Sequence, residues 1–250
     1  MTTTTPTAYA LPKVVSREDW LSARRALLAE EKSIKRQLDA VASRRRRLPM
    51  VRLEKPYHFT GPEGQLTLLD LFEGRRQLYV HHFMWNEQSR TFCLGCTAAA
   101  NTGFNNPHVR AYLNDRDVTF VAISRAPLEE IEAYRAEQGW TFSWYSSGDS
   151  DFNYDFHTTL DETRAPIEYN YRNRQELLET GLPPESLTGD WPANSVFVTD
   201  GEAVYHTYSA YTRGLDQLFL PFHFLELTPY GRQEDWEDSP EGWPQRPTHG

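Results

Sequence analysis

The two cysteines of this chain, Cys93 and Cys96, stand between two segments of opposite character. The apolar run at residues 78–85 precedes them and predicts a buried strand. The alanine-rich segment at 97–100 follows them and predicts the start of a helix. A C-x-x-C pair at the point where a strand gives way to a helix is typical of a redox-active dithiol.

The spacing assigns a different role to each thiol. A thiol in the first turn of a helix lies near unpaired N–H groups and the positive end of the helix dipole. Both favour the thiolate, so we expect Cys93 to have a lowered pKa and to be the nucleophile. Cys96 lies one turn later and is close enough to resolve a mixed disulfide. Cys93 and Cys96 are therefore the predicted catalytic residues.

Three other interpretations of these cysteines stay open. They could be two structural residues, because free cysteine is commonly buried. A structural zinc site is disfavoured, since it requires four ligands and the chain has no second C-x-x-C. Soft ligands with imidazole would suit Cu(I), and the candidate ligands are Cys93, Cys96, Met84, His81, His82 and His206. The sequence predicts no organic cofactor.

Composition limits the classes of protein to which the chain can belong. A length of 250 residues predicts one large domain or a domain plus extensions. A composition of 39% hydrophobic and 24% charged residues is typical of a globular protein. The net charge of −9 argues against general nucleic-acid binding. The sequence contains no run of about 20 apolar residues, so no membrane span is predicted. The first residues lack the basic-then-apolar order of a signal peptide, and two cysteines without a disulfide framework favour the cytoplasm.

Residues 1–50 predict a leader followed by one long amphipathic helix. Ser16 is the expected N-cap, with two acidic residues in the first turn. Four arginines at 44–47 suit the C-terminal end of the helix dipole, and Pro49 follows them as the stop. Apolar residues recur at helical spacing between these ends: Leu21, Leu27, Leu28, Ile34, Leu38 and Val41. This apolar stripe is expected to pack against either the domain core or the second subunit of a homodimer.

Residues 51–228 predict an α/β domain. Turn residues at 60–64 indicate a hairpin, and a short helix ends at Gly74. The β-branched run at 117–124 predicts a buried strand, followed by a helix from Pro127 to Gly139 and a strand at 140–144. This order implies a right-handed crossover between parallel strands. A hairpin at 195–208 and a terminal helix close the domain, and residues 229–250 are expected to be a flexible tail.

The segment from 146 to 194 is the least regular part of the chain. The aromatic residues of an insertion at 157–194 are expected to pack a loop onto the domain rather than to line a pocket. Asp151 and Asp155 are spaced as a helical pair, which is weak evidence for a metal or acid–base site.

The order of these motifs resembles the thioredoxin superfamily, and residues 56–125 look like peroxiredoxin-type members. Over most of its length the chain is similar to a bacterial thioredoxin-like family, domain of unknown function 899. The matching segments are WLSARR (20–25), RLPMV (47–51), HFM (82–84), DVTFVAISRAP (117–127), SDFNYD (150–155) and HTYS (206–209).

The resemblance implies a thioredoxin-like mixed sheet flanked by helices. Within this fold, the C-x-x-C pair predicts a thiol–disulfide oxidoreductase that acts on a protein or small-molecule thiol or disulfide. The alternatives are a copper-binding protein of the same fold and a non-catalytic binding scaffold. Two departures from the superfamily affect redox poise and substrate recognition. Leu94 and Gly95 stand between the cysteines, and Ala193 stands where thioredoxins place a cis-proline.

Overall fold

The computed structural model describes residues 10–246, which divide into two compact units. One unit consists of residues 49–221. The other consists of the described parts of 1–48 and 222–249. No helix in the described residues is long and apolar enough to cross a membrane.

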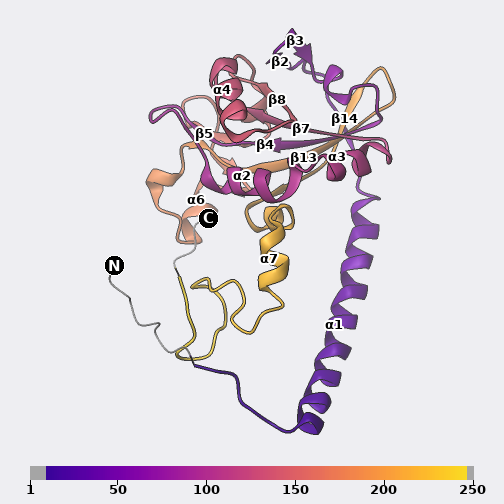
Figure 1. Cartoon of the computed structure of the whole chain (residues 1–250). Helices are drawn as coiled ribbons and strands as arrows, with labels where there is room; N and C mark the ends of the chain where they lie inside the picture. Colours follow the sequence, from indigo (N-terminus) through magenta and orange to yellow (C-terminus); the bar gives the residue numbers. More distant parts are fainter. Residues whose placement is uncertain (1–9, 247–250) are drawn as a thin grey trace. The chain divides into compact units, whose positions relative to one another are not determined.

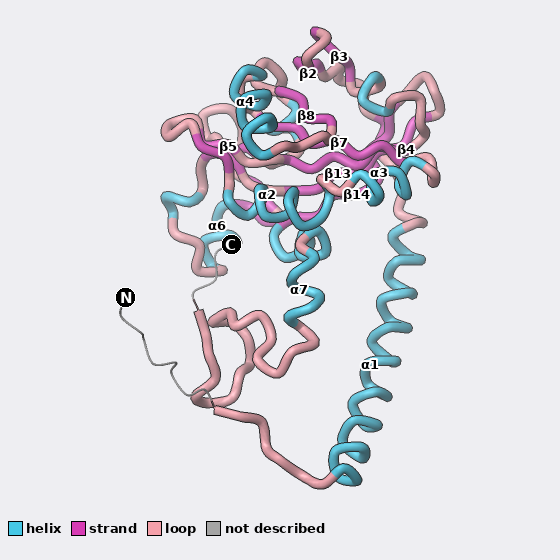
Figure 2. The backbone as a smooth tube through the Cα atoms, viewed as in Figure 1, coloured by secondary structure: helices cyan, strands magenta, loops and turns pink. Residues whose placement is uncertain are grey.

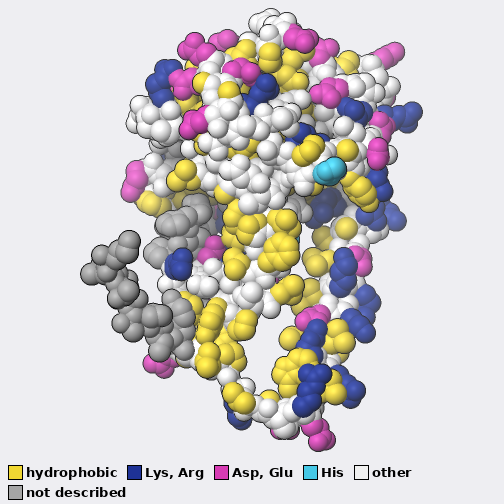
Figure 3. Space-filling model, viewed as in Figure 1, with side chains coloured by type: hydrophobic (Ala, Val, Ile, Leu, Met, Phe, Trp, Pro, Cys, Tyr) yellow, Lys and Arg dark blue, Asp and Glu magenta, His cyan; other side chains and the backbone are white. Residues whose placement is uncertain are grey.

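The smaller unit contains the long helix α1, Arg17–Arg45, as expected (Figure 1). The Ser16 hydroxyl accepts a hydrogen bond from the backbone N–H of Asp19 at 3.1 Å, which caps the helix. No residue of α1 is buried, and its exposed apolar side chains are interleaved with basic ones (Figure 3). The packing of this apolar stripe against the domain core or a second subunit therefore stays a prediction.

The C-terminal segment of the smaller unit is tied to the start of the chain. The Tyr230 hydroxyl donates to the carbonyl of Ala10 at 3.1 Å, and the backbone N–H of Ala10 donates to the carbonyl of Gly242 at 3.3 Å. The guanidinium of Arg232 lies 3.4 Å from the ring centroid of Phe222. Flexibility of the tail stays a prediction.

An eight-stranded mixed sheet organises residues 49–221, in the order β1-β14-β13-β4-β7-β8-β2-β3 (Figure 2). The central strands β4, β7 and β8 are parallel, and β13 pairs antiparallel with both β4 and β14. The strands span Val51–Arg52 (β1), His58–Gly61 (β2), Gly64–Thr67 (β3), Gln77–His82 (β4), Val118–Ser124 (β7), Ser143–Ser146 (β8), Ala193–Thr199 (β13) and Val204–Tyr211 (β14).

Helices follow the strands in the order expected for this topology. They are η1 (Asp70–Phe72), α2 (Leu94–Ala99), a π-helical turn η2 (Ala100–Phe104), α3 (Pro107–Asn114), α4 (Leu128–Gln138) and, after the last strand, η4 (Thr212–Leu218) and α7 (Leu220–Leu225). Pro107 occupies the first turn of α3, where its missing N–H costs nothing, and Gly139 ends α4 in the left-handed conformation.

Alternation along β7 divides the core into two clusters, one on each face of the sheet. Val121 and Ile123 belong to the cluster under η1, together with Phe59, Phe72 and Phe197. Phe120 and Ala122 belong to the other cluster. Its remaining members come mainly from α2, η2, α4 and β8: Cys96, Ala99, Ala100, Phe104, Ile131, Trp140, Phe142 and Trp144.

Sequence reasoning misplaced some boundaries. The strand expected at 140–144 is β8, Ser143–Ser146, because the rings of Trp140 and Phe142 pack in the core ahead of it. The terminal helix is divided into η4 and α7. The hairpins β2–β3 and β13–β14, the parallel crossover from β4 to β7 and the strand–C-x-x-C–helix unit are nevertheless present. These features confirm the thioredoxin-like fold class.

The insertion and the segment before it carry small elements of their own. They are α5 (Phe152–Asp155), β9 (Thr159–Leu160), β10 (Glu168–Tyr169), β11 (Arg172–Asn173), α6 (Arg174–Glu179), η3 (Pro184–Ser186) and β12 (Gly189–Asp190). Strands β9 and β12 pair antiparallel. A third apolar cluster, which includes Tyr169, Leu177 and Tyr211, packs the insertion against β14. The expected packing of insertion aromatics onto the domain is therefore found.

Candidate functional site

Cys93 lies at the junction between a small hairpin and helix α2. The hairpin strands β5 (Trp85–Asn86) and β6 (Thr91–Phe92) pair antiparallel, and the backbone N–H of Cys93 donates to the carbonyl of Met84 at 3.2 Å. Cys93 is the N-cap of α2, and its sulfur accepts the backbone N–H of Cys96 at 3.4 Å. The helix start thus supplies the donors that its sequence position predicts.

The two thiols are polarised in opposite directions. Hydrogen bonds from the Cys96 thiol, and from the backbone N–H groups of Cys96 and Gly95, lower the pKa of Cys93 to about 6. The same interaction and burial raise the pKa of Cys96 well above its ordinary value. Cys96 is 4% exposed, whereas Cys93 is half-buried. Cys93 is therefore the more reactive thiol at neutral pH.

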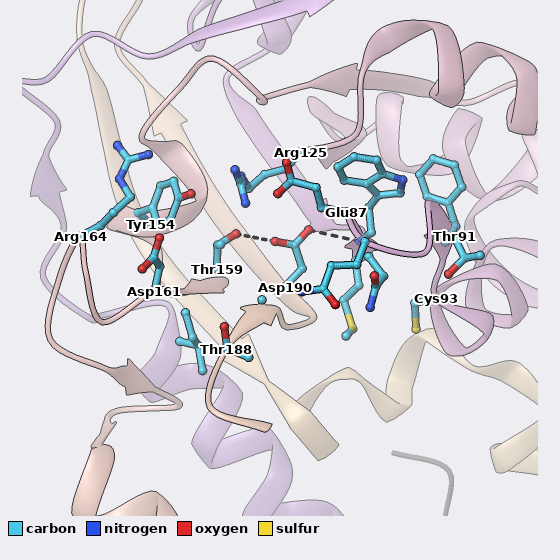
Figure 4. Close-up of a pocket in the computed structure, with 17 residues that line it drawn as sticks. Glu87, Thr91, Cys93, Arg125, Tyr154, Thr159, Asp161, Arg164, Thr188 and Asp190 are labelled. Carbon is cyan, nitrogen blue, oxygen red and sulfur yellow. Dashed lines mark hydrogen bonds between the residues drawn. The ribbon is translucent and has the colours of Figure 1, made fainter. Parts of the chain in front are cut away.

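Cys93 opens into a pocket of about 690 Å³ (Figure 4). One wall comes from the β5–β6 hairpin and contains Trp85, Glu87 and Phe92. The opposite wall comes from the loop after β7 and from residues 154–190: Arg125, Tyr154, Thr159, Leu160, Asp161, Arg164, Thr188, Gly189 and Asp190. The insertion therefore contributes to the site through residues other than its aromatics, and Tyr154, which precedes the insertion, is the aromatic residue of this wall.

Asp190 occupies the centre of this wall, between Cys93 and Tyr154 in Figure 4. Its carboxylate accepts the hydroxyl of Thr159 at 2.6 Å and the backbone N–H of Trp85 at 3.2 Å. Burial raises the pKa of Asp190 to about 6, although these two hydrogen bonds act to lower it. The charge of Asp190 also raises the pKa of Cys96, which puts the two groups within electrostatic range.

The raised pKa of Asp190 predicts how the unfolding free energy depends on pH. The folded value of about 6 exceeds the ordinary value of 3.8, so the folded state favours the protonated carboxyl. The unfolding free energy of the wild type, relative to Asp190→Asn, should fall by about 3 kcal/mol as pH rises from about 4 to about 6. It should stay level above that range.

Urea denaturation of both reduced proteins across this pH range measures the difference. Using the difference cancels the titration of all groups that the two proteins share. A difference that is constant with pH would contradict the assigned burial of the Asp190 charge.

The other carboxylates singled out in the sequence have a structural role. Lys55 bridges Asp151 at 2.7 Å and Asp155 at 2.8 Å, and the Tyr57 hydroxyl donates to Asp155 at 2.8 Å. Arg164 binds the second oxygen of Asp151 at 2.6 Å. These contacts hold the segment before the insertion against the domain.

The histidines are bound to neighbours in the core. His82 hydrogen-bonds Ser195 at 2.9 Å and Thr158 at 3.2 Å, and His81 hydrogen-bonds Asn194 at 2.9 Å. Burial lowers the pKa of His81 to about 4 and that of His82 to about 3, so both are neutral. Within residues 10–246, no three His, Cys, Asp or Glu side chains are grouped to hold a metal ion. His206 hydrogen-bonds Ser209 at 2.8 Å, and its ring packs against those of Phe156 and Phe197. The copper alternative therefore rests on Cys93, Cys96 and Met84.

The fold and the site together define a thioredoxin-like protein with a polarised dithiol at a helix start. Residues 9–248 match the family described as "Bacterial protein of unknown function (DUF899)". The chain belongs to this family.

Solved structures of peroxiredoxins are also similar to this chain. One structure of Xanthomonas campestris peroxiredoxin Q is 14% identical, with 68% of this chain and 91% of that chain covered and a TM-score of 0.42. Peroxidoxin BcpB from Mycobacterium tuberculosis is 10% identical, with 69% and 93% covered and a TM-score of 0.42. No curated protein sequence matches the chain.

Proposed function

We propose that this protein is a thiol–disulfide oxidoreductase in which Cys93 attacks and Cys96 resolves. The observation that carries the proposal is the opposite polarisation of two adjacent thiols. Cys93 is held as a thiolate by donors at the start of α2, while Cys96 is buried and keeps its proton. A reactive thiolate beside a protonated partner is the starting state that dithiol exchange requires.

The proposed reaction has two displacements. The Cys93 thiolate attacks one sulfur of a substrate disulfide, which forms a mixed disulfide and releases one substrate thiolate. The Cys96 thiol then loses its proton and attacks the Cys93 sulfur, which releases the second substrate thiolate and leaves a Cys93–Cys96 disulfide. The substrate gains two electrons and the protein loses two. An external dithiol must restore the reduced protein.

Asp190 is the group best suited to accept the Cys96 proton. It is buried in the pocket into which Cys93 opens, and its pKa of about 6 lets it accept and release a proton near neutral pH. Its charge acts on Cys96 and contributes to the raised pKa of that thiol. Thr159 and the Trp85 backbone hold the carboxylate in place through the hydrogen bonds described above.

Alkylation of the reduced protein tests the proposal directly. The pH profile of iodoacetamide reaction at Cys93 should have its midpoint near pH 6, the folded pKa. A free cysteine would give about 8.5. Cys96 should stay unmodified over the same period because it is buried. Peptide mass spectrometry distinguishes the two sites.

The Cys96→Ser variant is the matched control for the source of the low pKa. It keeps the backbone donors at the start of α2 and replaces the thiol hydrogen bond with one from a hydroxyl. Its Cys93 midpoint should therefore stay well below about 8.5. Equal alkylation of both wild-type thiols, with ordinary midpoints, would refute the proposal.

A further inference from the structure

Arg125 is a cation in the Cys93 pocket that the proposed exchange reaction does not use. It follows β7 directly and is half-buried, and it lines the same pocket as Cys93. Its Nε atom is buried without a hydrogen-bond partner, and within residues 10–246 its guanidinium forms no ion pair. The ring of Tyr154 lies nearby, with its centroid 5.0 Å from Cζ of Arg125.

The second arginine of the pocket differs in this respect. Arg164 binds Asp151 at 2.6 Å and lies 4.1 Å from the centroid of the Tyr154 ring. The charge of Arg164 is therefore already paired, whereas no carboxylate among the described residues lies within ion-pair distance of Arg125. A buried donor without an acceptor is unfavourable, which indicates that a ligand completes the Arg125 site.

The shape of a guanidinium selects the ligand. Its planar set of N–H donors matches the two oxygens of a carboxylate. In Figure 4, Asp190 lies between Arg125 and Cys93, so a small molecule bound to both would pass over the proposed proton acceptor.

The acidic residues of the pocket restrict the charge that it can accept. Glu87 and Asp161 also line it, and the charge of Arg125 acts on both Asp161 and Asp190. These carboxylates would repel several negative charges placed inside the pocket, which favours a ligand that brings one carboxylate to the guanidinium.

We propose that Arg125 binds the carboxylate of a small thiol or disulfide whose sulfur reacts at Cys93. This inference rests on the proposed exchange function and names its substrate class: small organic disulfides that carry one carboxylate on the half whose sulfur reacts with Cys93.

Two disulfides of similar size provide the test. The reduced protein is mixed in single turnover with 3,3′-dithiodipropionate, which carries a carboxylate on each half, or with neutral bis(2-hydroxyethyl) disulfide. Arg125→Gln should slow the reaction with the carboxylate disulfide by about tenfold or more, as expected for loss of a charged hydrogen bond. The reaction with the neutral disulfide should change little, which also shows that the variant is folded.

Arg116→Gln is the matched control, because it removes one positive charge from an exposed position outside the pocket. It should leave both rates unchanged. Equal loss with both disulfides in Arg125→Gln would overturn the inference, since Arg125 would then act on Cys93 or on the fold. No change with either disulfide would also overturn it.

Alkylation separates this inference from the exchange proposal. Iodoacetate and iodoacetamide deliver the same carbon to Cys93, with and without a carboxylate. If the wild type reduces neither disulfide, the exchange proposal fails, and the iodoacetate-to-iodoacetamide rate ratio still decides the role of Arg125. That ratio should fall by about tenfold in Arg125→Gln and stay constant in Arg116→Gln. A ratio unaffected by Arg125→Gln refutes carboxylate binding.

Discussion

Replacing Cys93 with serine is expected to abolish disulfide reduction, with a rate loss of more than about ten-thousandfold. A serine hydroxyl is not ionised at neutral pH, so the hydrogen bonds that stabilise the Cys93 thiolate have no charge to stabilise. The loss should appear with every disulfide and should be largest above about pH 6, where Cys93 of the wild type is ionised. Release of substrate thiol, followed by absorbance after rapid mixing, gives the rate.

Cys96→Ser should behave differently, and this contrast is the control. Attack by Cys93 remains possible, so one substrate thiol should be released per protein and the other half should stay attached. Intact-mass measurement detects the trapped adduct. Substantial turnover by Cys93→Ser, or no adduct in Cys96→Ser, would show that the chemistry occurs elsewhere.

Trp144→Ala should be the most destabilising single change in the core around α2. Trp144 is 0% exposed, and its ring centroid lies 4.5 Å from that of Phe83 and 5.0 Å from that of Phe92. Truncation leaves a cavity under the hairpin that leads to Cys93, and we expect a loss of about 3–5 kcal/mol of unfolding free energy. Urea denaturation followed by circular dichroism measures it.

Two variants define the origin of that loss. Tyr112→Ala removes an aromatic ring that is 60% exposed and should change stability by no more than about 0.5 kcal/mol. Trp144→Phe should cost much less than the alanine variant, because the Trp144 indole N–H is buried with no acceptor among the described residues and its removal breaks no hydrogen bond. A loss under about 1 kcal/mol for Trp144→Ala would contradict the packing.

The main features of the fold could be predicted because each depends on local chemistry. Asp200 and Gly201 form the hairpin turn between β13 and β14, where Gly201 has a φ of 102° and Asp200 accepts the N–H groups of Glu202 and Ala203. The dithiol could be predicted for the same reason. The donors that polarise Cys93 come from the next three residues of the chain.

The far wall of the site could not be predicted from the sequence. Asp190 is 94 residues beyond Cys96 in the numbering, and its position depends on the pairing of two-residue strands that show no hydrophobic periodicity. Arg125 follows a strand whose apolar character was clear, but its side chain gives no signal of the pocket that it enters. The available hint was the polar run at 188–190 before a proline, which also suits an ordinary turn.

The pocket is built from segments that lie far apart in the sequence, which has a consequence for protein engineering. A graft of residues 84–99 onto another scaffold would carry the cap and the backbone donors that make Cys93 acidic. It would leave behind β12 and its carboxylate, so under the proposed role of Asp190 the grafted dithiol would attack quickly and resolve the adduct slowly. The native insertion could, in turn, be exchanged between relatives to alter substrate choice while the attacking thiol keeps its acidity.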